Sequence, residues 1–387
     1  MRRNRIILAA LWILSLVGIS FYGGPVSYGF FTVLTLLPLV SLLYLVIVLF
    51  RFKIYQTFEG KELVAGHMVP FFFTLQNEDP FTFSGVRVTF YADFSEIDGL
   101  SDKTEYELLP RTSITRQTGL ICRYRGEYHV GIKAVILTDY LRLFRITYQN
   151  REPLRVTVLP DLVTPEALRS IDAETLSRRE ATGAGACPDV TVRDYLPGDD
   201  IRRIHWKLAA KTGELSVRNS VSEEKDGVII LLDTLRISEA PSVYLPVENT
   251  LLESALALAL FLRNKNIPSS VSYSHGGLHT CAVSHDQPFD GLYRELSGIR
   301  FETDALQSAF LTALTADGTL FSARIALILT AKATEEILTF SRLLGDGGTE
   351  VVLYRVMPGE EDAPPVSISP HVTLLTLPGG CRVTDYL

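Results

Sequence analysis

The chain has 387 residues, more than one hydrophobic core usually serves, so we expect two or three domains. Five of its 37 basic side chains lie in the first 53 residues, which hold no acidic side chain, and the other 32 are outnumbered by 44 acidic ones. The net charge of −12 beyond residue 53 argues against non-specific nucleic-acid binding. The cysteines show no C-x-x-C pair and no zinc-site spacing, so we expect reduced thiols and no disulfide framework at Cys122, Cys187, Cys281 and Cys381.

Two uncharged apolar runs, residues 6–22 and 30–50, stand near the start of the chain. Each approaches the roughly 20 residues that a helix needs to cross the hydrocarbon of a bilayer. The stretch between them, GGPVSYG, is typical of a short turn. Residues 1–53 are therefore predicted to form a transmembrane helical hairpin. A cleaved secretory signal is the alternative for the first run, but no small-x-small cleavage site stands out.

The charges beside these runs predict an orientation. Arg2, Arg3 and Arg5 precede the first run, Arg51 and Lys53 follow the second, and the turn carries no charge. Because basic residues favour the cytoplasmic side, we expect a cell-membrane protein with two helices, both termini and the main body being cytoplasmic.

Residues 54–160 have the pattern of short strands separated by turn residues. The apolar or β-branched runs are VPFFFTLQN, GVRVTFYADF, ITRQTGLICRY, GEYHVGIKAVIL and LRVTVLP, and no helical candidate lies among them. This spacing predicts a small antiparallel β-sandwich-like domain. Gly126 and Gly131 are expected to serve backbone geometry.

Residues 161–226 are predicted to be a connector. A polar helix is expected around TPEALRSIDAETLSRREA, followed by a flexible TGAGA tract. A phosphate-binding loop is the alternative for that tract, but it lacks the Lys-Ser/Thr ending and follows no apolar strand.

The end of this connector carries the densest cluster of charge in the chain. Pro197-Gly198 predicts a turn, after which Asp199 or Asp200 caps a short helix running through Trp206 to Ala210. Such a mixture of signs fits either an ion-pair clamp between domains or a site for a partner or anion, and both interpretations stay open. The candidate residues are Arg193, Tyr195, Pro197, Gly198, Asp199, Asp200, Arg202, Arg203, Trp206 and Lys207.

Beyond Gly227 the pattern changes to alternating strands and helices. The strands are GVIILLD, SSVSYSHGG, RIALILT and EVVLYRV, and the helices are VENTLLESALALALFLRNKN and TEEILTFSRLLG. This alternation predicts a doubly wound α/β domain over residues 227–387. Ligands of such folds bind at the carboxyl ends of strands where the strand order reverses, so Asp233, which ends the first strand, is the first residue to examine.

The charged segment before that first strand resembles the signature of the DUF58 family. The family pattern, Arg-x-Tyr-x-Pro-Gly-Asp-Asp-x-Arg-x-Ile-x-Trp-Lys, is matched residue by residue from Arg193 to Lys207. A second stretch, from Arg125-Gly126-Glu127-Tyr128 to Leu143-Phe144, resembles the family's β-domain less closely, since Tyr140 and Leu141 replace Pro-Phe. The resemblance implies that the α/β domain is von Willebrand factor A-like, with a Rossmann-like sheet.

The same resemblance bears on metal binding at Asp233. In a metal-binding A domain this position opens an Asp-x-Ser-x-Ser motif, whose oxygens suit Mg²⁺. Here Leu235 and Ile237 stand in place of both serines, and Arg236 adds a positive charge. We therefore expect a degenerate site without metal, in which Asp233 either caps the following segment or pairs with Arg236.

No catalytic constellation emerges from the sequence. His275, His279 and His285 lie in a segment that alternates like a hairpin, with no supporting carboxylate at metal-site spacing. No G-x-S-x-G elbow is present, and Cys281 with His279 two residues away would share one face of a strand. We expect no enzyme and no cofactor.

The resemblance implies a membrane-anchored cytoplasmic adaptor. Members of the family look like partners of MoxR-type AAA+ ATPases, beside transglutaminase-like membrane proteins, in envelope assembly or protein maturation. The expected partners are thus such an ATPase, a transglutaminase-like membrane protein and the lipid bilayer, with no nucleic acid. The alternative is a metal-dependent ligand-binding receptor, or an enzyme, that uses Asp233.

Overall fold

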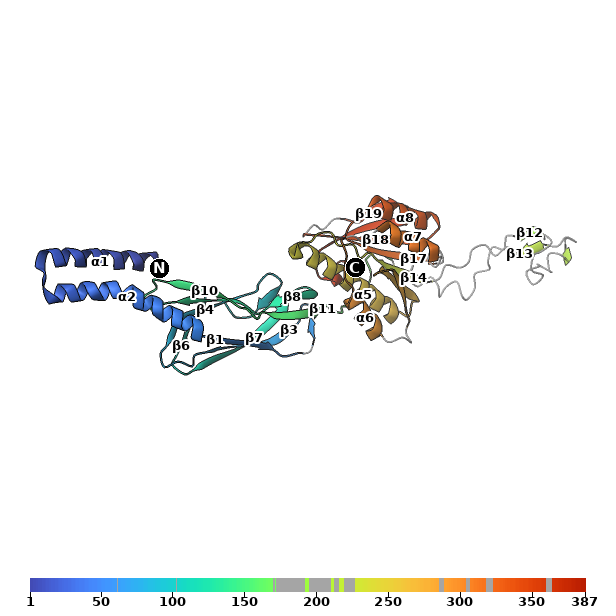
Figure 1. Ribbon diagram of the computed structural model, residues 1–387. Helices are drawn as coiled ribbons and strands as arrows, with labels where there is room; N and C mark the ends of the chain where they lie inside the picture. Colours follow the sequence, from blue (N-terminus) through green and yellow to red (C-terminus); the bar gives the residue numbers. More distant parts are fainter. Residues whose placement is uncertain are drawn as a thin grey trace. The chain divides into compact units, whose positions relative to one another are not determined.

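A computed structural model describes the chain as two compact units, Met1–Asp161 and Leu162–Leu387 (Figure 1). The described residues are 1–60, 62–101, 103–169, 171, 192–194, 210–211, 216–218, 227–284, 289–303, 307–317, 323–359 and 364–387.

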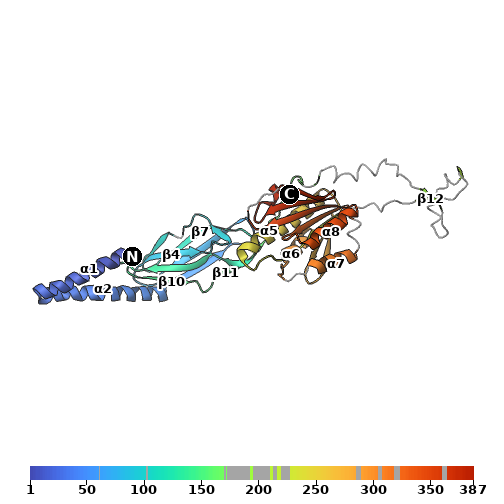
Figure 2. The same ribbon diagram turned by 90° about the horizontal axis from the view of Figure 1, so that it is seen from above.

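The first unit begins with two helices that lie side by side, α1 (Arg2–Tyr22) and α2 (Gly24–Arg51) (Figure 2). Both are long and apolar enough to cross a membrane. The prediction of a seven-residue turn between them is wrong, because only Gly23 separates the two helices. Gly23, with φ of +57°, reverses the chain, and Pro25 favours a helix start because its fixed φ suits the first turn. The second helix consequently starts at Gly24 instead of residue 30.

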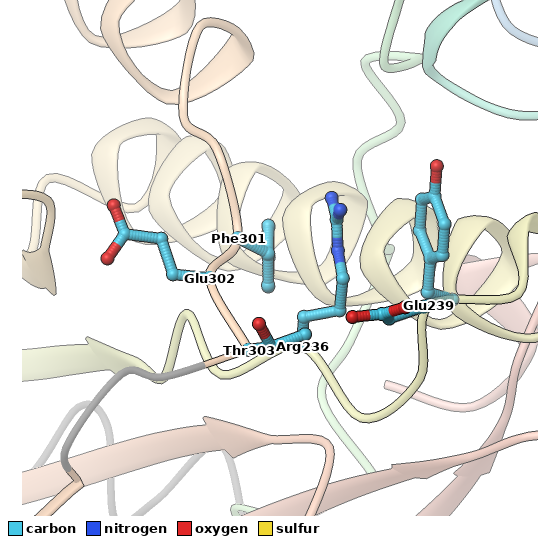
Figure 3. A pocket seen from close by; sticks show the side chains of 6 residues that line it. Arg236, Glu239, Phe301, Glu302 and Thr303 are labelled. Atoms are coloured by element: carbon cyan, nitrogen blue, oxygen red, sulfur yellow. The ribbon is translucent and has the colours of Figure 1, made fainter.

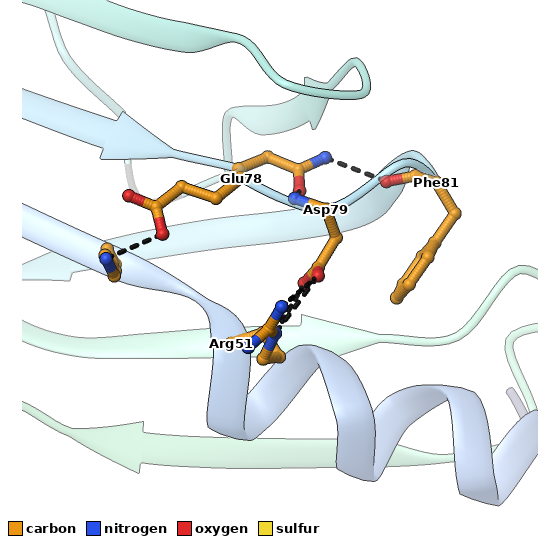
Figure 4. Close-up of polar contacts among 6 residues, drawn as sticks. Arg51, Glu78, Asp79 and Phe81 are labelled. Carbon is orange, nitrogen blue, oxygen red and sulfur yellow. Dashed lines mark hydrogen bonds and ion pairs between the residues drawn. The ribbon is translucent and has the colours of Figure 1, made fainter.

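The last three turns of α2 pack against the strands that follow. Leu45 and Val48 are fully buried there, and the Tyr44 hydroxyl donates to the Thr82 carbonyl at 2.9 Å. At the helix end, Arg51 forms an ion pair with the buried Asp79, with Nη2 and Oδ1 2.8 Å apart (Figure 4). This part of α2 therefore belongs to the core of the strand-rich region.

The strand-rich region consists of three sheets whose pairs are mostly antiparallel. The first sheet has the order β1-β3-β7-β5, the second β10-β9-β4-β6 and the third β2-β11-β8. All five predicted runs contain strands, and no helix is assigned among the described residues between the first and last strand. The strands are β1 (Lys53–Phe58), β2 (Leu63–Val64), β3 (Met68–Gln76), β4 (Phe83–Phe90), β5 (Ser95–Ile97), β6 (Glu105–Leu108), β7 (Ser113–Cys122), β8 (Gly126–Val130), β9 (Ile132–Thr138), β10 (Arg145–Gln149) and β11 (Leu154–Leu159).

Aromatic side chains join the first two sheets. Phe73 of β3 is fully buried, and its ring lies 5.8 Å from that of Phe90 on β4 and 6.1 Å from that of Tyr106 on β6. Edge-to-face contacts of this kind add to the burial of apolar area. The two four-stranded sheets therefore face each other across a shared apolar core.

Gly131 divides the predicted run GEYHVGIKAVIL into two strands of different sheets, β8 and β9. Its φ is +78°, and a Cβ atom there would lie 2.6 Å from Oε1 of Gln56. That oxygen accepts the backbone N–H of Ile132 at 2.9 Å, so it is held in place. Glycine is required at this corner for backbone geometry, as the sequence predicts.

The second unit begins differently from the prediction. Residues 164–169 and 171 are not helical, although a polar helix was expected to include them. Leu168 and Ile171 are buried instead in the core of this unit, and the Arg169 N–H donates to the carbonyl of Leu387. Burial of these two apolar side chains overrides the local helix propensity. The rest of the predicted helix and the TGAGA tract lie outside the described residues.

A seven-stranded sheet of order β16-β15-β14-β17-β18-β20-β19 forms the centre of the second unit. Its five central strands are parallel, and β16 and β19 pair antiparallel at the edges. The predicted alternation of strands and helices is confirmed. The elements are β12 (Val192–Asp194), β13 (Ser216–Arg218), β14 (Val228–Leu232), α5 (Pro241–Asn264), β15 (Ser269–Ser274), β16 (Leu278–Val283), α6 (Phe289–Ser297), α7 (Gln307–Asp317), β17 (Ile325–Thr330), α8 (Glu335–Asp346), β18 (Glu350–Met357), β19 (Val366–Ser369), β20 (Val372–Pro378) and the 3-10 turn η3 (Val383–Asp385).

Helices cover both faces of this sheet (Figure 1). Ile230 of β14 joins the apolar cluster of α5 and α6, whereas its neighbour Leu231 joins that of α7 and α8. Strands buried on both faces become continuous apolar runs, which explains the sequence VIILL. Helix α5 also has the length and hydropathy of a membrane span, but 89% of its most apolar window is buried inside this unit.

Gly131→Ala should weaken the corner between β8 and β9. A left-handed backbone costs a non-glycine residue about 1–2 kcal/mol, and the new methyl group must also displace Gln56. We expect faster hydrogen exchange at the β8 and β9 amides of the full-length protein in detergent. Gly99→Ala is the matched control, because Gly99 has φ of +66° and nothing within 4 Å of the added carbon. Unchanged exchange at β8 and β9 in Gly131→Ala would contradict the proposed role of this glycine.

Candidate functional site

The carboxyl edge of the parallel sheet is the part of the second unit where a ligand site is expected. Strand β14 lies between β15 and β17, so the chain reverses its direction of winding there. A crevice forms outside the strand ends at such a reversal. Three polar residues from separate parts of the chain meet at this point: Asp233 after β14, Thr330 at the end of β17 and Gln307 at the start of α7.

Asp233 is 5% exposed, and its carboxylate accepts three hydrogen bonds. Oδ2 accepts from Thr330 Oγ1 at 2.7 Å and from Gln307 Nε2 at 2.6 Å, and Oδ1 accepts from the Leu235 N–H at 3.1 Å. Burial raises the pKa of the Asp233 carboxyl, and the three hydrogen bonds oppose this shift. The bond from Leu235 shows that Asp233 caps the segment that follows it, one of the two predicted alternatives.

A second layer of hydrogen bonds orients Gln307. Thr334 donates its hydroxyl to Gln307 Oε1 at 2.8 Å and accepts the Ile337 N–H as the cap of α8. The amide of Gln307 therefore directs its NH₂ group, a donor, at Asp233. The adjoining cavity, bordered by Leu231 and Phe310, has a volume of only about 10 Å³. Both oxygens of the Asp233 carboxylate thus accept hydrogen bonds from the protein itself.

In the described part of the chain, no cluster of acidic, histidine or cysteine ligands forms at Asp233. Across the described residues, no group of three or more histidine, cysteine, aspartate or glutamate side chains is arranged to hold a metal ion. Thr330 and Gln307 supply the partners that an ion would otherwise provide. The chemistry of this donor set fits a buried carboxylate satisfied by the protein itself.

Arg236 does not pair with Asp233, which was the other predicted alternative. Its guanidinium binds Glu248 of α5, with Nε and Oε1 2.7 Å apart, and lies 4.0 Å from the centre of the Tyr244 ring. Glu248 is buried, so it requires a cation nearby. This requirement determines the direction of the Arg236 side chain.

A pocket of about 500 Å³ opens beside Arg236 (Figure 3). Backbone hydrogen bonds of 3.0 and 3.1 Å tie the loop after β14 to Glu302, so this part of the wall is held firmly. In Figure 3 the Arg236 side chain stands between those of Glu302 and Glu239. Both carboxylates are exposed, and no ion pair is recorded for either within the described part of the chain. The pocket is lined by Arg236, Glu239, Tyr244, Phe301, Glu302 and Thr303.

The rim of this pocket suits a positively charged group. Arg236 is neutralised by Glu248, so Glu239 and Glu302 dominate the local charge. Tyr244, which is half-buried, adds aromatic surface against which the stem of a lysine or arginine can pack, whereas Phe301 is only 3% exposed at the pocket wall.

The predicted hairpin of histidines and cysteine is confirmed as β15 and β16. His279 stacks on Tyr273 at 5.4 Å, and its Nε2 lies 3.0 Å from the His275 carbonyl, whereas His285 lies outside the described residues. The Cys281 thiol donates to Glu295 at 3.2 Å, and Tyr273 donates its hydroxyl to the same carboxylate. Burial and the bond to Glu295 raise the pKa of Cys281 to about 11, so the thiol is protonated near neutral pH.

Most residues of the charged signature fall outside the described residues. Arg193 belongs to β12, where it pairs with Val217 of β13, and Ala210 and Lys211 are helical. The capped turn therefore stays a prediction. The two interpretations of the segment, an ion-pair clamp between domains or a site for a partner or anion, both stay open. The undescribed candidates are Tyr195, Pro197, Gly198, Asp199, Asp200, Arg202, Arg203, Trp206 and Lys207.

Sequence reasoning missed Gln307 and Thr330 beside Asp233, Glu248 beside Arg236, and every residue of the pocket lining except Arg236. Thr330 ends the predicted strand RIALILT, so its place at the carboxyl edge was available from the pattern. Gln307 and Glu248 carry no such signal, because neither belongs to a motif and each is defined by a contact with a distant segment.

Comparison with protein families places residues 191–271 in the family described as "Protein of unknown function DUF58". This segment belongs to the DUF58 family. The DUF58 match begins just before β12 and continues through β14 and α5 into β15, so it includes Asp233 and Arg236. Among curated proteins, none matches the chain.

Three solved structures that match the chain are 9–10% identical to it. The cupredoxin domain of amoB from Nitrosocaldus yellowstonii is 10% identical, with 30% of this chain and 96% of that one covered and a TM-score of 0.20. A cohesin module from the family 33 glycoside hydrolase of Clostridium perfringens is also 10% identical, with coverages of 27% and 96% and a TM-score of 0.19. A GH20 exo-β-N-acetylglucosaminidase from Vibrio harveyi is 9% identical, with coverages of 80% and 58% and a TM-score of 0.18. None of these likenesses carries an argument about this protein.

Divalent cations should leave the stability of the protein unchanged. A ligand that binds only the folded state raises the melting temperature, whereas the Asp233 carboxylate already has three donors. We expect equal melting temperatures of the full-length protein in detergent with EDTA, Mg²⁺ or Mn²⁺. Asp233→Ala is the control, and a rise with cation that this variant abolishes would show that a metal site exists.

Proposed function

We propose that the chain is a membrane-anchored cytoplasmic adaptor that binds a protein partner through its α/β unit. The observation that carries this proposal is the acidic, aromatic pocket at the sheet edge, beside a buried carboxylate that the protein satisfies by itself. Binding there would rely on side-chain contacts and charge complementarity, without a bridging ion.

The finer fold is part of the proposal. Two features support a von Willebrand factor A-like unit. The central sheet is parallel and has helices on both faces, and Asp233 directly follows its first long strand, β14. The two facing four-stranded sheets support a β-sandwich-like domain, which follows the helices in the sequence.

A MoxR-type AAA+ ATPase is the proposed partner, with a transglutaminase-like membrane protein as a second one, in envelope assembly or protein maturation. The resemblance to DUF58 proteins supports this choice, and the acidic rim calls for a basic patch on the partner. The net negative charge beyond residue 53 argues against nucleic acid. A metal-dependent receptor or an enzyme at Asp233 is the weaker candidate, because donors surround this carboxylate.

The membrane anchor is the helical pair α1 and α2. Both helices meet the length and hydropathy of a span, and the five basic side chains of the first 53 residues stand at the outer ends of the pair. By the positive-inside rule, both termini and the two folded units are cytoplasmic.

A reporter fused after Leu387 should be active only in the cytoplasm. A pair of fusions tests this, one with a reporter that works in the cytoplasm and one with a reporter that needs an oxidising compartment. A fusion of the second reporter within the Gly23 turn should show the opposite behaviour, because this turn is expected on the far side of the membrane. Activity of the second reporter after Leu387 would overturn the proposed orientation.

Reversing one charge at the pocket rim should weaken binding of the ATPase. Glu302→Lys places a cation where a basic group of the partner is expected, so we predict an affinity loss of about tenfold, which corresponds to roughly 1.4 kcal/mol. The measurement is the dissociation constant between the full-length protein in detergent and a purified MoxR-type ATPase from the same genome.

The matched control is Asp346→Lys, which makes the same charge reversal at an exposed position at the end of α8, away from the pocket. An equal loss in both variants would indicate a general charge effect and would refute the pocket as the docking site. No binding by the wild-type protein would refute the choice of partner.

A further inference from the structure

Both helices of the first unit hold one loop of the strand-rich region, residues 139–144. From α1, Asn4 donates its amide to the Leu141 carbonyl at 2.8 Å, and Arg5 donates Nε to the Leu143 carbonyl at 2.6 Å. From α2, Ser41 donates its hydroxyl to the buried carboxylate of Asp139. The loop is therefore fixed at the level of Asn4 on one helix and Ser41 on the other.

These contacts with the 139–144 loop determine how much of each helix is free to enter a bilayer. Beyond it, residues 6–22 of α1 and 24–40 of α2 contain 17 residues each, a length of about 25 Å at 1.5 Å per residue. The hydrocarbon of a bilayer is about 30 Å thick, so a bilayer of that thickness around these segments reaches the level of the loop. Tyr140 and Leu141, at the tip of the loop, are 55% and 40% exposed.

A groove of about 450 Å³ runs between this loop and α2. Val33 and Val40 are seven residues apart along its wall, and the groove reaches as far as Tyr44, so it extends for about 16 Å along the helix axis. Tyr140 packs against Tyr44 in the groove wall, with ring centroids 4.9 Å apart and the rings tilted by 40°. The surface is almost entirely apolar, with walls formed by Val33, Leu36, Leu37 and Val40 of α2 and by Tyr140 and Leu141 of the loop.

Basic side chains lie near the loop that forms one wall of this groove. Arg2 and Arg3 precede the residues of α1 that grip the loop, and both are exposed with no ion pair recorded among the described residues. Arg142, in the loop itself, is exposed and shares Glu105 with Arg87. An elongated apolar groove with cations near its wall is complementary to an anionic phospholipid, which joins apolar chains to a negative headgroup.

We infer that the groove between α2 and the 139–144 loop holds one acyl chain of an anionic bilayer phospholipid, whose phosphate meets Arg2 and Arg3. This inference rests on the proposed insertion of α1 and α2 into a membrane. Because the loop belongs to the strand-rich region, such a lipid seals the junction between the anchor and the first folded domain.

Photo-crosslinking with a lipid tests the site in the full-length protein. The protein is placed in phosphatidylglycerol vesicles that contain a phosphatidylglycerol with a diazirine on its acyl chain, irradiated and mapped by peptide mass spectrometry. We expect label on Tyr140 and Leu141 as well as on α1 and α2, and none on Tyr55 of β1, which is equally exposed but lies on a strand.

Two substitutions on α2 form a matched pair. Val40→Trp fills the groove and should lower labelling of the loop about tenfold, whereas Leu39→Trp, one residue earlier and not part of the groove wall, should leave it unchanged. Loop labelling should fall by a similar factor in the double variant Arg2→Ala, Arg3→Ala. It should also fall in the wild-type protein when a phosphatidylcholine probe in phosphatidylcholine vesicles is used.

Label on both helices without label on the loop would overturn the lipid site and leave the membrane anchor intact. Absence of label from the helices as well would overturn the proposed insertion itself. Loop labelling that persists in Val40→Trp would exclude the groove as its location, and equal labelling by phosphatidylcholine would exclude the preference for an anionic lipid.

Discussion

Burial of the Asp233 carboxylate at the carboxyl edge of the sheet is the constraint on which the arrangement of the second unit depends. A carboxylate removed from water needs hydrogen-bond donors or a cation. Here the donors are Thr330, Gln307 and the backbone N–H of Leu235. Three separate segments of the chain must therefore meet at the Asp233 carboxylate. That convergence positions the start of α7 and the loop after β14, and thereby one wall of the neighbouring pocket.

The same physical rule acts a second time, in the first unit. Asp139 is 2% exposed, and its carboxylate accepts the hydroxyl of Ser41 and the Phe144 N–H, the latter at 2.7 Å. A buried acid in a strand-connecting loop thus determines where the apolar helix α2 meets the folded domain. In both units a desolvated carboxylate joins segments that are far apart in the chain, and a candidate binding surface lies beside it.

Hydrophobic pattern predicted the elements that are buried on both faces. Strands such as VIILL and IALILT are continuous apolar runs because helices cover both sides of the sheet, and no other feature of the sequence is needed to place them. Edge strands carry a weaker signal: β1 and β10 alternate half-buried and exposed residues and were not among the predicted runs. The polar stretch after Thr164 has helix-forming residues, yet Leu168 and Ile171 are buried in a non-helical conformation.

The sequence by itself determined the order of helices, sheets and α/β unit, the apolar character of the first two helices and the absence of hydroxyl groups at positions 235 and 237. These are properties of local composition and periodicity, which the chain carries before it folds. Only the tertiary structure decided what surrounds Asp233, that Arg236 binds Glu248, and how deep α2 enters the strand-rich region. Gln307 and Thr330 lie 74 and 97 residues from Asp233, so their contact with it arises from strand order, and local pattern holds no information about it.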